Sequence, residues 1–369
     1  MSSKWVAVSF LFTLTLSSAA GSDLWQMGES AVIHPNGTRP DLWNGEIAFL
    51  EGSGGPVMFY NGSESDVIFE SSSSCWEPQN ANGSVAWRHM ESGASSNEIY
   101  RWDGDSIINV SNSSGVVDCD LSGGSNGDLL WSKEHEDLMY YDLSEDAVID
   151  LGVPGVRPSL YINDSGVATY AYQDPDTDEV FYFDGETTHL LGAGNSNGAS
   201  PCVWDGAVAW VGQGIEGSYF TKGEIFFWKN GVVERITNDD EAGSGVADEF
   251  PAVWCDTVVW CRAVDSIFAP KLFIWDGYGV SQLTSETAKY PSMHHGKLAW
   301  VGDDGMRMAD MYRSGDLDFD QDVDLSDLAT LLGNYGDAGA SYAEGDINGD
   351  GVVNADDLAI LIALYGYQL

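Results

Sequence analysis

A five-residue pattern recurs seven times along the chain, and it constrains the fold more than any other feature of the sequence. Each copy begins with Gly, or with Asp in one case, and continues with one free position, two mostly apolar residues and an aromatic residue. Copies spaced by about 40 residues indicate one structural unit per period, which must stack on its neighbours to bury its apolar face. The copies are Gly45 to Phe49, Gly83 to Trp87, Gly127 to Trp131, Gly166 to Tyr170, Gly206 to Trp210, Asp256 to Trp260 and Gly296 to Trp300.

Further strand signals surround each copy. In the first six periods an aromatic and β-branched run follows and ends in a turn signal, as Glu179 to Phe183 does before Asp184-Gly185. Asp-Gly after such a run favours a tight hairpin, because both turn positions take positive φ. A third run, such as Val232 to Thr237, and a short strand after a Pro bring the count to four strands per period, which is one propeller blade. Five copies carry this Pro, at Pro40, Pro78, Pro201, Pro251 and Pro291, and the third and fourth copies lack it.

The two ends of the repeat region predict how the ring closes. Residues 24–34 have the pattern of late blade strands, whereas the last copy is followed only by a degenerate strand at 306–312. We therefore expect the N-terminal strands to complete the last blade, which removes exposed sheet edges. The architecture resembles the TolB-like and WD-repeat-like β-propellers, without a family-specific catalytic motif. The prediction is a mainly β fold with a seven-bladed propeller at 21–312, with six or eight blades as alternatives, and a small helical module at 313–369.

The repeat assigns most tryptophans to equivalent positions. Those that end the five-residue pattern are expected to fill the space between neighbouring blades. A second set, Trp43, Trp204 and Trp254, stands two residues before the Gly position, and His294 occupies this place in the last copy. The strand that carries these four residues is expected to line the central channel. They are therefore either packing residues or a ligand-binding surface for sugar rings and other flat apolar groups.

Five cysteines are compatible with an oxidising compartment, but they are too few for a disulfide scaffold. Their odd number leaves at least one unpaired within the chain. Cys75 and Cys119 each stand twelve residues before the aromatic residue of their copies. Equivalent positions on adjacent blades can be close enough to bridge, so a Cys75–Cys119 disulfide is a further prediction.

Residues 315–369 contain 12 acidic residues and no Lys or Arg, in two segments that match at an offset of 30 residues. The second has the spacing of a calcium loop, with side-chain oxygens at positions 1, 3, 5, 9 and 12 and a backbone carbonyl at position 7. Gly351 stands at position 6 of this loop, where the chain bends sharply. Position 6 of the first loop is Gln321, which adopts such a bend at a conformational cost that Gly does not have. Hard oxygen ligands in this number favour Ca²⁺. The predicted ligands are Asp316, Asp318, Asp320, Asp322, Asp324 and Asp327, then Asp346, Asn348, Asp350, Val352, Asn354 and Asp357.

A helix is expected after each loop, and no helix is readable before either. Apolar residues recur at i, i+3, i+4 and i+7, which predicts one apolar face on each helix. Gly336 and Gly366 then end the two helices. The predicted faces consist of Leu328, Leu331, Leu332 and Tyr335, and of Leu358, Leu361, Ile362 and Tyr365.

Two loops, each with an exiting helix, resemble the type I dockerin domain with its tandem calcium-binding F-hand repeats, over the whole of residues 313–369. The resemblance implies calcium-dependent, non-covalent docking onto a cohesin module of a scaffold or cell-surface protein. It also implies that loop positions 10 and 11, here Leu325-Ser326 and Ala355-Asp356, help to select the partner. These are not the Ser-Thr pairs familiar from cellulosomal dockerins, so either the partner is unusual or the module only braces its own chain.

The first 20 residues have the form of a secretory signal peptide. Lys4 precedes an apolar stretch from Trp5 to Leu16, and Ser17-Ser18-Ala19-Ala20 supplies small residues for cleavage. The alternative, a membrane anchor, is disfavoured because the stretch is short, and no other segment has the pattern of a membrane-spanning helix. We therefore expect a secreted protein that works outside the cell or at its surface.

Composition limits the partners and leaves several functions open. With 58 Asp and Glu against 15 Lys and Arg, the net charge of −43 repels nucleic acids and anionic membranes. No nucleophile elbow, phosphate loop or zinc motif is present in the sequence. We expect a binding component of an extracellular assembly, with polysaccharide binding or breakdown as its process. The alternatives are a dockerin-borne glycoside hydrolase or polysaccharide lyase, which a cluster of carboxylates in a cleft would favour, and a propeller that binds protein.

Overall fold

A computed structural model describes most of the chain between residues 25 and 366. The chain divides into two compact units, Val32–Met308 on the one hand and Met1–Ala31 with Ala309–Leu369 on the other. The predicted signal peptide and Gln321 lie outside the described residues. The described residues are 25–71, 73–113, 115–163, 165–195, 198–213, 223–238, 247–263, 269–277, 279–320 and 322–366.

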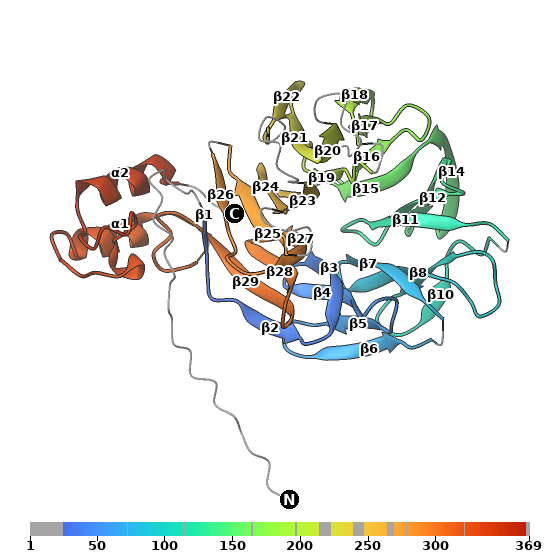
Figure 1. The fold of residues 1–369 in the computed structure, drawn as a ribbon, viewed down its shortest axis with the longest axis horizontal. Coiled ribbons are helices and arrows are strands. Elements are labelled where there is room, and N and C mark those ends of the chain that lie inside the picture. Colours follow the sequence, from blue (N-terminus) through green and yellow to red (C-terminus); the bar gives the residue numbers. More distant parts are fainter. Residues whose placement is uncertain are drawn as a thin grey trace, which may run out of the picture. The chain divides into compact units, whose positions relative to one another are not determined.

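Seven antiparallel sheets confirm the predicted mainly β, seven-bladed propeller. Figure 1 shows the sheets around a common centre, with the first strand of each blade innermost. The first three blades are β3–β6 (Gly37–Trp43, Glu46–Glu51, Val57–Tyr60, Ser65–Phe69), β7–β10 (Cys75–Ala81, Ser84–His89, Glu98–Trp102, Ile107–Asn109) and β11–β14 (Asp118–Gly123, Leu129–Lys133, Asp137–Asp142, Ala147–Pro154). The next three are β15–β18 (Val156–Ile162, Ala168–Gln173, Glu179–Phe183, Thr188–Ala193), β19–β22 (Cys202–Trp204, Ala207–Gln213, Gly223–Lys229, Val232–Arg235) and β23–β26 (Asp248–Trp254, Thr257–Arg262, Lys271–Trp275, Val280–Gln282).

The seventh blade combines strands from both ends of the repeat region, as the sequence predicts. It contains β27 (Ala288–His294), β28 (Lys297–Gly302) and β29 (Gly305–Arg313). Strand β2 (Ala31–His34) pairs with β29, and β1 (Trp25–Met27) pairs antiparallel with the end of β29, Trp25 opposite Arg313. Chain segments distant in sequence thus share one sheet.

Every blade has a residue in the left-handed region of φ within its first strand or, for Ser200 in the fifth blade, two residues before that strand. These seven φ values lie between 43° and 55°, which is uncommon for residues other than Gly. In six blades the pairing of the first and second strands shifts register next to this residue, so a β-bulge is repeated around the ring. We call this set the bulge ring: Arg39, Glu77, Asp120, Arg157, Ser200, Phe250 and Tyr290.

Proline follows the bulge residue in six of the seven blades, which corrects the sequence analysis at the fourth blade. Pro158 directly follows Arg157 and therefore occupies the position that Pro40 occupies after Arg39. Its spacing to Gly166 differs because the turn between β15 and β16 is longer than the corresponding turns in the blades whose Pro was predicted. Only the third blade, with Leu121, lacks this Pro.

Hydrogen bonds between the innermost strands join consecutive blades. In five blades the residue two positions after the bulge residue uses its side chain to accept a backbone N–H from the next blade. The Ser292 hydroxyl accepts the Leu42 N–H at 2.9 Å and so joins the last blade to the first. Four further bonds of this kind run from Asn80 N to Asp41 Oδ2 at 2.7 Å, Gly123 N to Gln79 Oε1 at 3.3 Å, Leu160 N to Ser122 Oγ at 2.9 Å and Val203 N to Ser159 Oγ at 3.0 Å.

Replacing Ser122 by Ala is expected to destabilise the propeller by about 1–3 kcal/mol. The Leu160 N–H, in a residue that is 6% exposed, then loses its acceptor and stays buried without another. Urea unfolding of the full chain measures the change in free energy. Ser165→Ala, at an exposed turn position, is the matched control and should stay within about 0.5 kcal/mol. Equal unfolding midpoints for the two variants would show that the inter-blade bond contributes nothing.

The predicted tryptophan positions are buried between blades. Trp87, Trp131, Trp210 and Trp260 are at most 1% exposed. Trp210 of the fifth blade packs against Val180 and other residues of the fourth. In the third and sixth blades a buried carboxylate also accepts the indole N–H, Asp118 from Trp131 at 2.9 Å and Asp248 from Trp260 at 2.8 Å.

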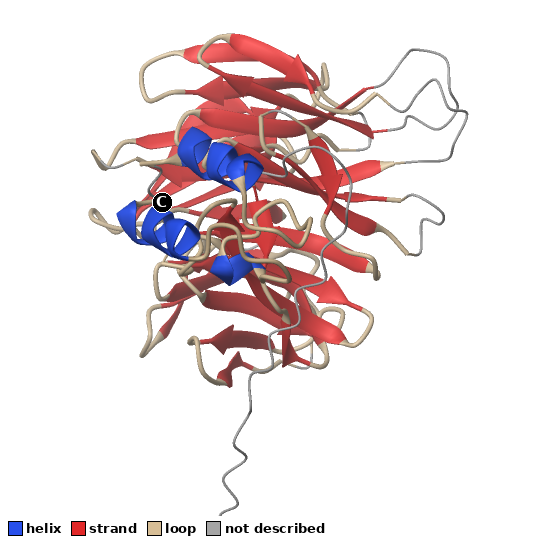
Figure 2. Cartoon of the chain, turned by 90° about the vertical axis from the view of Figure 1, so that its left-hand side faces the viewer, coloured by secondary structure: helices blue, strands red, loops and turns tan. Residues whose placement is uncertain are grey.

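The C-terminal module repeats its own structure at the predicted offset. It contains α1 (Leu325–Gly333), the short 3₁₀ helix η2 (Tyr342–Glu344) and α2 (Ala355–Leu364), and Figure 2 shows helices only in this part of the described chain. The halves exchange hydrogen bonds: Gly336 N donates to Val353 O and Gly366 N to Val323 O, both at 2.8 Å. Buried residues at 30-residue intervals form the core, Leu317 and Ile347, Val323 and Val353, and Leu331 and Leu361, with Tyr342 added.

The predicted apolar helix faces are only partly correct. Leu331 and Leu361 are fully buried, but the residues that follow them by one position, Leu332 and Ile362, are 53% and 58% exposed. Each helix packs through a narrow stripe, because the module has only two short helices and one small core. The outer part of each face, which includes Tyr335 and Tyr365, therefore lies in solvent.

The predicted disulfide is wrong: Cys75 and Cys119 are both free thiols. Cys75 and Cys119 occupy their predicted blades and are both buried. Each thiol contacts its own blade instead of the neighbouring one. Sγ of Cys75 lies 3.6 Å from Nδ1 of His89, and Sγ of Cys119 lies 3.2 Å from Oγ of Ser132. The two thiols occupy equivalent, buried positions in neighbouring blades, but these positions are not next to each other.

Candidate functional site

The carboxylate at position 12 organises each predicted calcium loop. Asp357 is fully buried, and its Oδ1 accepts the N–H groups of Ile347 and Asn348 at 2.8 and 3.0 Å while its Oδ2 accepts that of Asn354 at 2.8 Å. In the first loop Asp327 makes the equivalent bonds, with Leu317 N at 2.6 Å, Asp318 N at 3.3 Å and Asp324 N at 2.7 Å. The same atoms thus fold both loops, which supports a duplicated site.

Buried oxygens without hydrogen-bond partners test whether a cation fits these loops. Oδ2 of Asp346, at position 1, accepts the Gly351 N–H at 2.9 Å, but its Oδ1 is buried without a partner among the described residues. Oδ1 of Asp322, at position 7 of the first loop, is likewise buried and without a partner there. A buried carboxylate oxygen is costly unless a donor or cation satisfies it. The residues present therefore fit a cation.

The predicted ligands of the first loop form two groups. Ligand atoms of Asp316, Asp318 and Asp320 lie within 4.8 Å of one another, as do those of Asp322, Asp324 and Asp327. In the second loop Asn348 and Asp350 are exposed, and the carbonyl of Val352 accepts an N–H from the Asn354 amide at 3.0 Å. All ligand groups of both loops are oxygens, which is the donor set of Ca²⁺.

Two glycine positions of the repeat escaped the sequence analysis. Gly315 and Gly345 precede position 1 of each loop, with φ of 98° and 110°, and each packs against a buried Leu of the other helix, Leu361 and Leu331. A Cβ at Gly345 would lie 3.1 Å from Cα of Leu331, so the loop approaches the helix backbone closely. Their 30-residue spacing was the signal that could have found them.

The predicted partner-binding residues lie on the surface of the module. Leu325 and Ser326 begin α1, Ala355 and Asp356 begin α2, and all four are exposed. The exposed outer parts of the helix faces add Leu332, Tyr335, Ile362 and Tyr365 to this surface. Both halves of the repeat therefore present apolar side chains at equivalent positions.

The propeller contains a cavity of about 500 Å³ at its centre. Its walls are the first strands of all seven blades, and every residue of the bulge ring lines it. Arg39 stacks over the ring of Tyr290 at 4.3 Å, and Phe250 meets Tyr290 edge-on at 4.9 Å. Three carboxylates also line this channel pocket: Asp41, Glu77 and Asp120.

The four aromatic side chains predicted to line the channel, Trp43, Trp204, Trp254 and His294, lie close together. Trp43 and His294 lie 3.8 Å apart between ring centroids, and Trp204 lies 5.1 Å from His294 and 6.4 Å from Trp254. Trp254 and His294 are only 2% exposed, so most of this aromatic cluster is packing rather than open binding surface. Trp43 and Trp204 keep partial exposure and line the channel pocket.

His294 offers one unsatisfied hydrogen-bonding atom. Its Nδ1 accepts the Asn44 N–H at 2.9 Å, so the neutral ring carries its proton on Nε2. Nε2 is buried and has no partner among the described residues. Burial, aided by the neighbouring His295, lowers the pKa of His294 to about 3 and keeps the ring neutral. A donor of this kind beside the pocket suits a ligand hydroxyl or carbonyl oxygen.

Asp41 is the most perturbed carboxylate of the channel pocket. Burial raises its pKa to about 7, against the opposing effects of the Asn80 N–H and the Ser292 hydroxyl. The side chain is partly exposed and lines the channel pocket. Burial also raises the pKa of Glu77, although Arg88 lies 3.2 Å away. Carboxylates with raised pKa values in a cavity are candidates for proton transfer.

Propeller stability is expected to fall as the pH rises from about 4 to about 7 because of Asp41. Its folded pKa of about 7 exceeds the ordinary value of 3.8, so within this window the folded state binds the extra proton. The stabilisation from Asp41 is fully present when the pH is below its ordinary pKa, and it is lost as the pH rises through its folded pKa. Between the two values the free energy of unfolding falls by up to about 1.4 kcal/mol per pH unit. Asp41→Asn should remove this slope in urea unfolding curves, whereas Asp66→Asn, at an exposed position, should retain it. Parallel pH profiles for wild type and Asp41→Asn would contradict the prediction.

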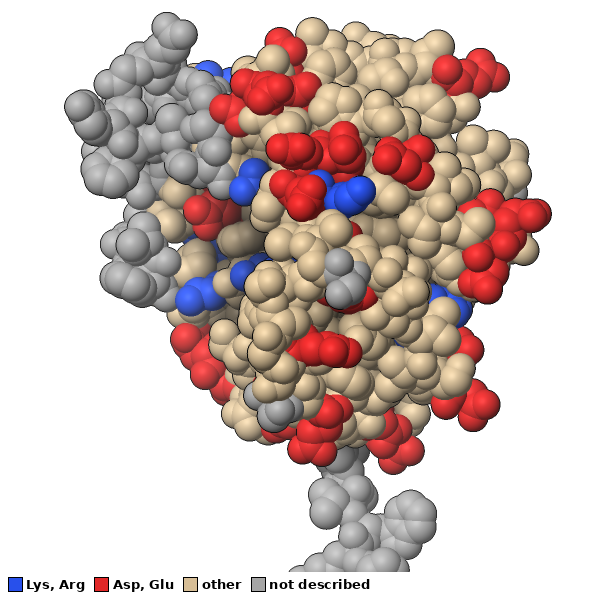
Figure 3. Space-filling view, turned by 90° about the vertical axis from the view of Figure 1, so that its right-hand side faces the viewer, with Lys and Arg blue, Asp and Glu red and all other residues tan. Residues whose placement is uncertain are grey.

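The surface carries the acidic excess of the composition. Figure 3 shows separate groups of Asp and Glu over one face, with few Lys and Arg among them. Such a field repels polyanions. Among the described residues no helix is long and apolar enough to cross a membrane.

Comparison with known proteins supports the fold class. No protein-family model and no curated protein matches the sequence. Among solved structures, BBS1N in complex with ARL6DN aligns with a TM-score of 0.51 at 10% identity, over 78% of this chain and 96% of that one. Pyrococcus horikoshii acylaminoacyl peptidase aligns with a TM-score of 0.50 at 10% identity, over 72% of this chain but only 48% of the peptidase. At these identities the likeness establishes a β-propeller and says nothing of activity.

Proposed function

We propose that residues 313–369 are a calcium-dependent docking module of the dockerin type, which attaches the propeller to a cohesin-type module on a scaffold or surface protein. The observation that carries the proposal is the duplicated loop. In each copy a buried Asp at position 12 accepts backbone N–H groups, and one oxygen of Asp346 or Asp322 is buried without a partner in the described part of the chain. Calcium bound there would neutralise part of each carboxylate cluster and hold the two helices in place.

The surface that would meet the partner is duplicated as well. Leu325 and Leu332 of α1 are 65% and 53% exposed, and Ile362 of α2 is 58% exposed. Exposed apolar side chains on a module this small favour association with another protein. They lie on the helices that begin in the two loops, so calcium that holds these helices in place would make the association depend on calcium.

Titration calorimetry of the full chain with Ca²⁺ tests the metal-binding part of the proposal. Two binding events per chain are expected, and Asp346→Asn should abolish one of them. Surface binding to a panel of immobilised cohesin modules, with calcium and with a chelator, tests the docking part. Calcium binding without capture by any cohesin would leave the module as a brace within its own chain and refute the docking role.

For the propeller we propose a binding domain whose ligand enters the channel pocket. Trp43 and Trp204 are partly exposed in this pocket and offer flat apolar surface beside the polar side chains of Asp41, Glu77 and Asp120. This combination favours a polysaccharide chain end, in keeping with a secreted, scaffold-bound protein. Retention of the chain on polysaccharide columns, and its loss in Trp204→Ala, is the expected result. Retention only by immobilised protein would instead favour a protein ligand.

A carbohydrate-active enzyme is the second candidate function, because three carboxylates line the same pocket and the pKa of Asp41 is raised to about 7. That value suits a general acid at neutral pH. Incubation with polysaccharides and analysis for released sugars tests this candidate. Product release that is lost in Asp41→Asn would establish the enzyme, and retention without product would establish the binding domain.

A further inference from the structure

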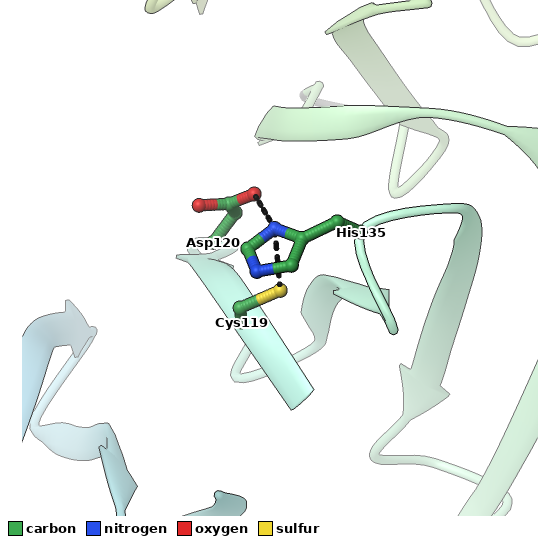
Figure 4. A group of neighbouring side chains, drawn as sticks. All are labelled: Cys119, Asp120 and His135. Carbon is green, nitrogen blue, oxygen red and sulfur yellow. Dashed lines mark hydrogen bonds and ion pairs between the residues drawn. The ribbon is translucent and has the colours of Figure 1, made fainter. Parts of the chain in front are cut away.

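A second cluster of metal-binding side chains lies in the third blade, far in sequence from the calcium loops. Cys119 and Asp120 are consecutive residues of β11, and His135 belongs to the turn between β12 and β13. Figure 4 shows the three side chains pointing toward one another. Sγ of Cys119 lies 3.2 Å from Nδ1 of His135, and Oδ2 of Asp120 lies 3.7 Å from the same nitrogen. Ligand atoms of all three residues lie within 4.8 Å of one another.

We infer that Cys119, Asp120 and His135 form a binding site for a divalent metal ion of the zinc class. Thiolate, imidazole and carboxylate are the protein ligands of zinc, whereas the calcium loops offer only oxygens. Metal–ligand distances of about 2.0–2.3 Å in a tetrahedron place ligand atoms roughly 3.3–3.8 Å apart. The 3.2 and 3.7 Å separations at Nδ1 are close to this range, so small side-chain adjustments would admit the ion.

The β-bulge explains how neighbouring residues can share a metal ion. In a regular strand, consecutive side chains point to opposite faces, so Cys119 and Asp120 would diverge. Asp120 has φ of 54°, and the pairing of β11 with β12 shifts register between Cys119 and Ser122. The turn residues Glu134 and His135 also have positive φ, 57° and 58°. The positive φ at Asp120 in β11 and in the turn between β12 and β13 thus brings the three side chains together.

Neighbouring groups hold the carboxylate in position. Oδ2 of Asp120 accepts the Ser132 hydroxyl at 3.1 Å and the Arg157 N–H at 3.3 Å. Ser132 Oγ also lies 3.2 Å from Sγ of Cys119. Groups behind the ligands fix ligand orientation and contribute to affinity in metal sites.

The site would keep one open position. Three protein ligands leave the fourth tetrahedral position to water or to a ligand atom. The His135 side chain is 63% exposed, so ions have access from solvent. Asp120 lines the channel pocket as part of the bulge ring. The metal ion would therefore lie at the edge of that pocket.

The preceding blade provides a matched comparison. Sγ of Cys75 lies 3.6 Å from Nδ1 of His89, so a Cys–His pair is present there too. His89 is only 4% exposed, and this pair belongs to no group of three metal-binding side chains among the described residues. The pair in the second blade is thus expected not to bind the metal ion.

Cobalt(II) titration of the full chain, with the calcium loops first saturated with Ca²⁺, tests the inference. One tetrahedral cobalt per chain is expected, with a thiolate-to-cobalt charge-transfer band in the ultraviolet, and Zn²⁺ should displace it. Cys119→Ser should abolish the charge-transfer band, since the thiol loses its proton to become the ligand. His135→Asn, at a turn position that tolerates positive φ, should weaken binding by more than about 10-fold.

Cys75→Ser is the matched control and should retain the band and the affinity of the wild type. Circular dichroism of each variant should show that the propeller remains folded. Absence of the band in the wild type would overturn the inference. A band that persists in Cys119→Ser and disappears in Cys75→Ser would show that the metal binds in the second blade, and this result would also overturn the inference.

Discussion

Removal of calcium is expected to abolish the cooperative thermal transition of the C-terminal module while the propeller transition persists. The carboxylates of Asp327 and Asp357 are fully buried, and one oxygen each of Asp322 and Asp346 has no partner among the described residues. Residues 315–369 contain no Lys or Arg that could compensate these charges. Calcium at about 1,000 times its dissociation constant would stabilise each site by about 4 kcal/mol. A module with one small core cannot lose that amount twice and stay folded.

Differential scanning calorimetry of the full chain, with calcium and with a chelator, measures this effect. Asp346→Ala should lower the calcium-dependent transition, because position 1 supplies both a ligand oxygen and the acceptor of the Gly351 N–H. Asp337→Ala removes the same charge from an exposed residue between the loops and is the matched control. Identical thermograms with calcium and with chelator would refute the calcium site.

Replacing Asp248 by Ala is expected to be the most damaging single substitution in the propeller. Asp248 is 1% exposed and accepts the Trp260 indole N–H at 2.8 Å and two guanidinium N–H groups of Arg262 at 2.7 and 2.9 Å. Removing one partner of a buried ion pair costs about 3–5 kcal/mol, because the remaining charge stays buried. A domain of this size loses about 2–4 °C per kcal/mol, so the melting temperature should fall by roughly 10 °C.

Asp256→Ala is the control for this prediction. Asp256 pairs with Lys229 at the surface, where its side chain is 53% exposed, and exposed pairs contribute about 0–1 kcal/mol. Thermal unfolding in the presence of calcium compares the two variants. If Asp248→Ala melts within about 2 °C of Asp256→Ala, the buried network does not stabilise the blade.

The repeat pattern was sufficient to predict the blades and the duplicated loops with their exiting helices, because both depend on local spacing. Turn glycines, strand alternation and loop positions can each be read within a single repeat, and the seven repeats support the same assignment of strands. Pro158 was missed for the same reason: its local spacing differs, although its place in the ring does not. The Cys75–Cys119 disulfide failed because equal depth in two blades is no measure of the distance between two thiols.

The sequence by itself determined the propeller class, with seven blades as the first choice, the strand exchange in the last blade, and the two loops with their exiting helices at the C-terminus. Only the tertiary structure decided that Trp254 and His294 are buried, and that Cys119, Asp120 and His135 meet. The physical reason is the backbone conformation of the innermost strands. The positive φ of the bulge ring breaks strand alternation at each innermost strand, and no periodic pattern reports which side chains then share a space.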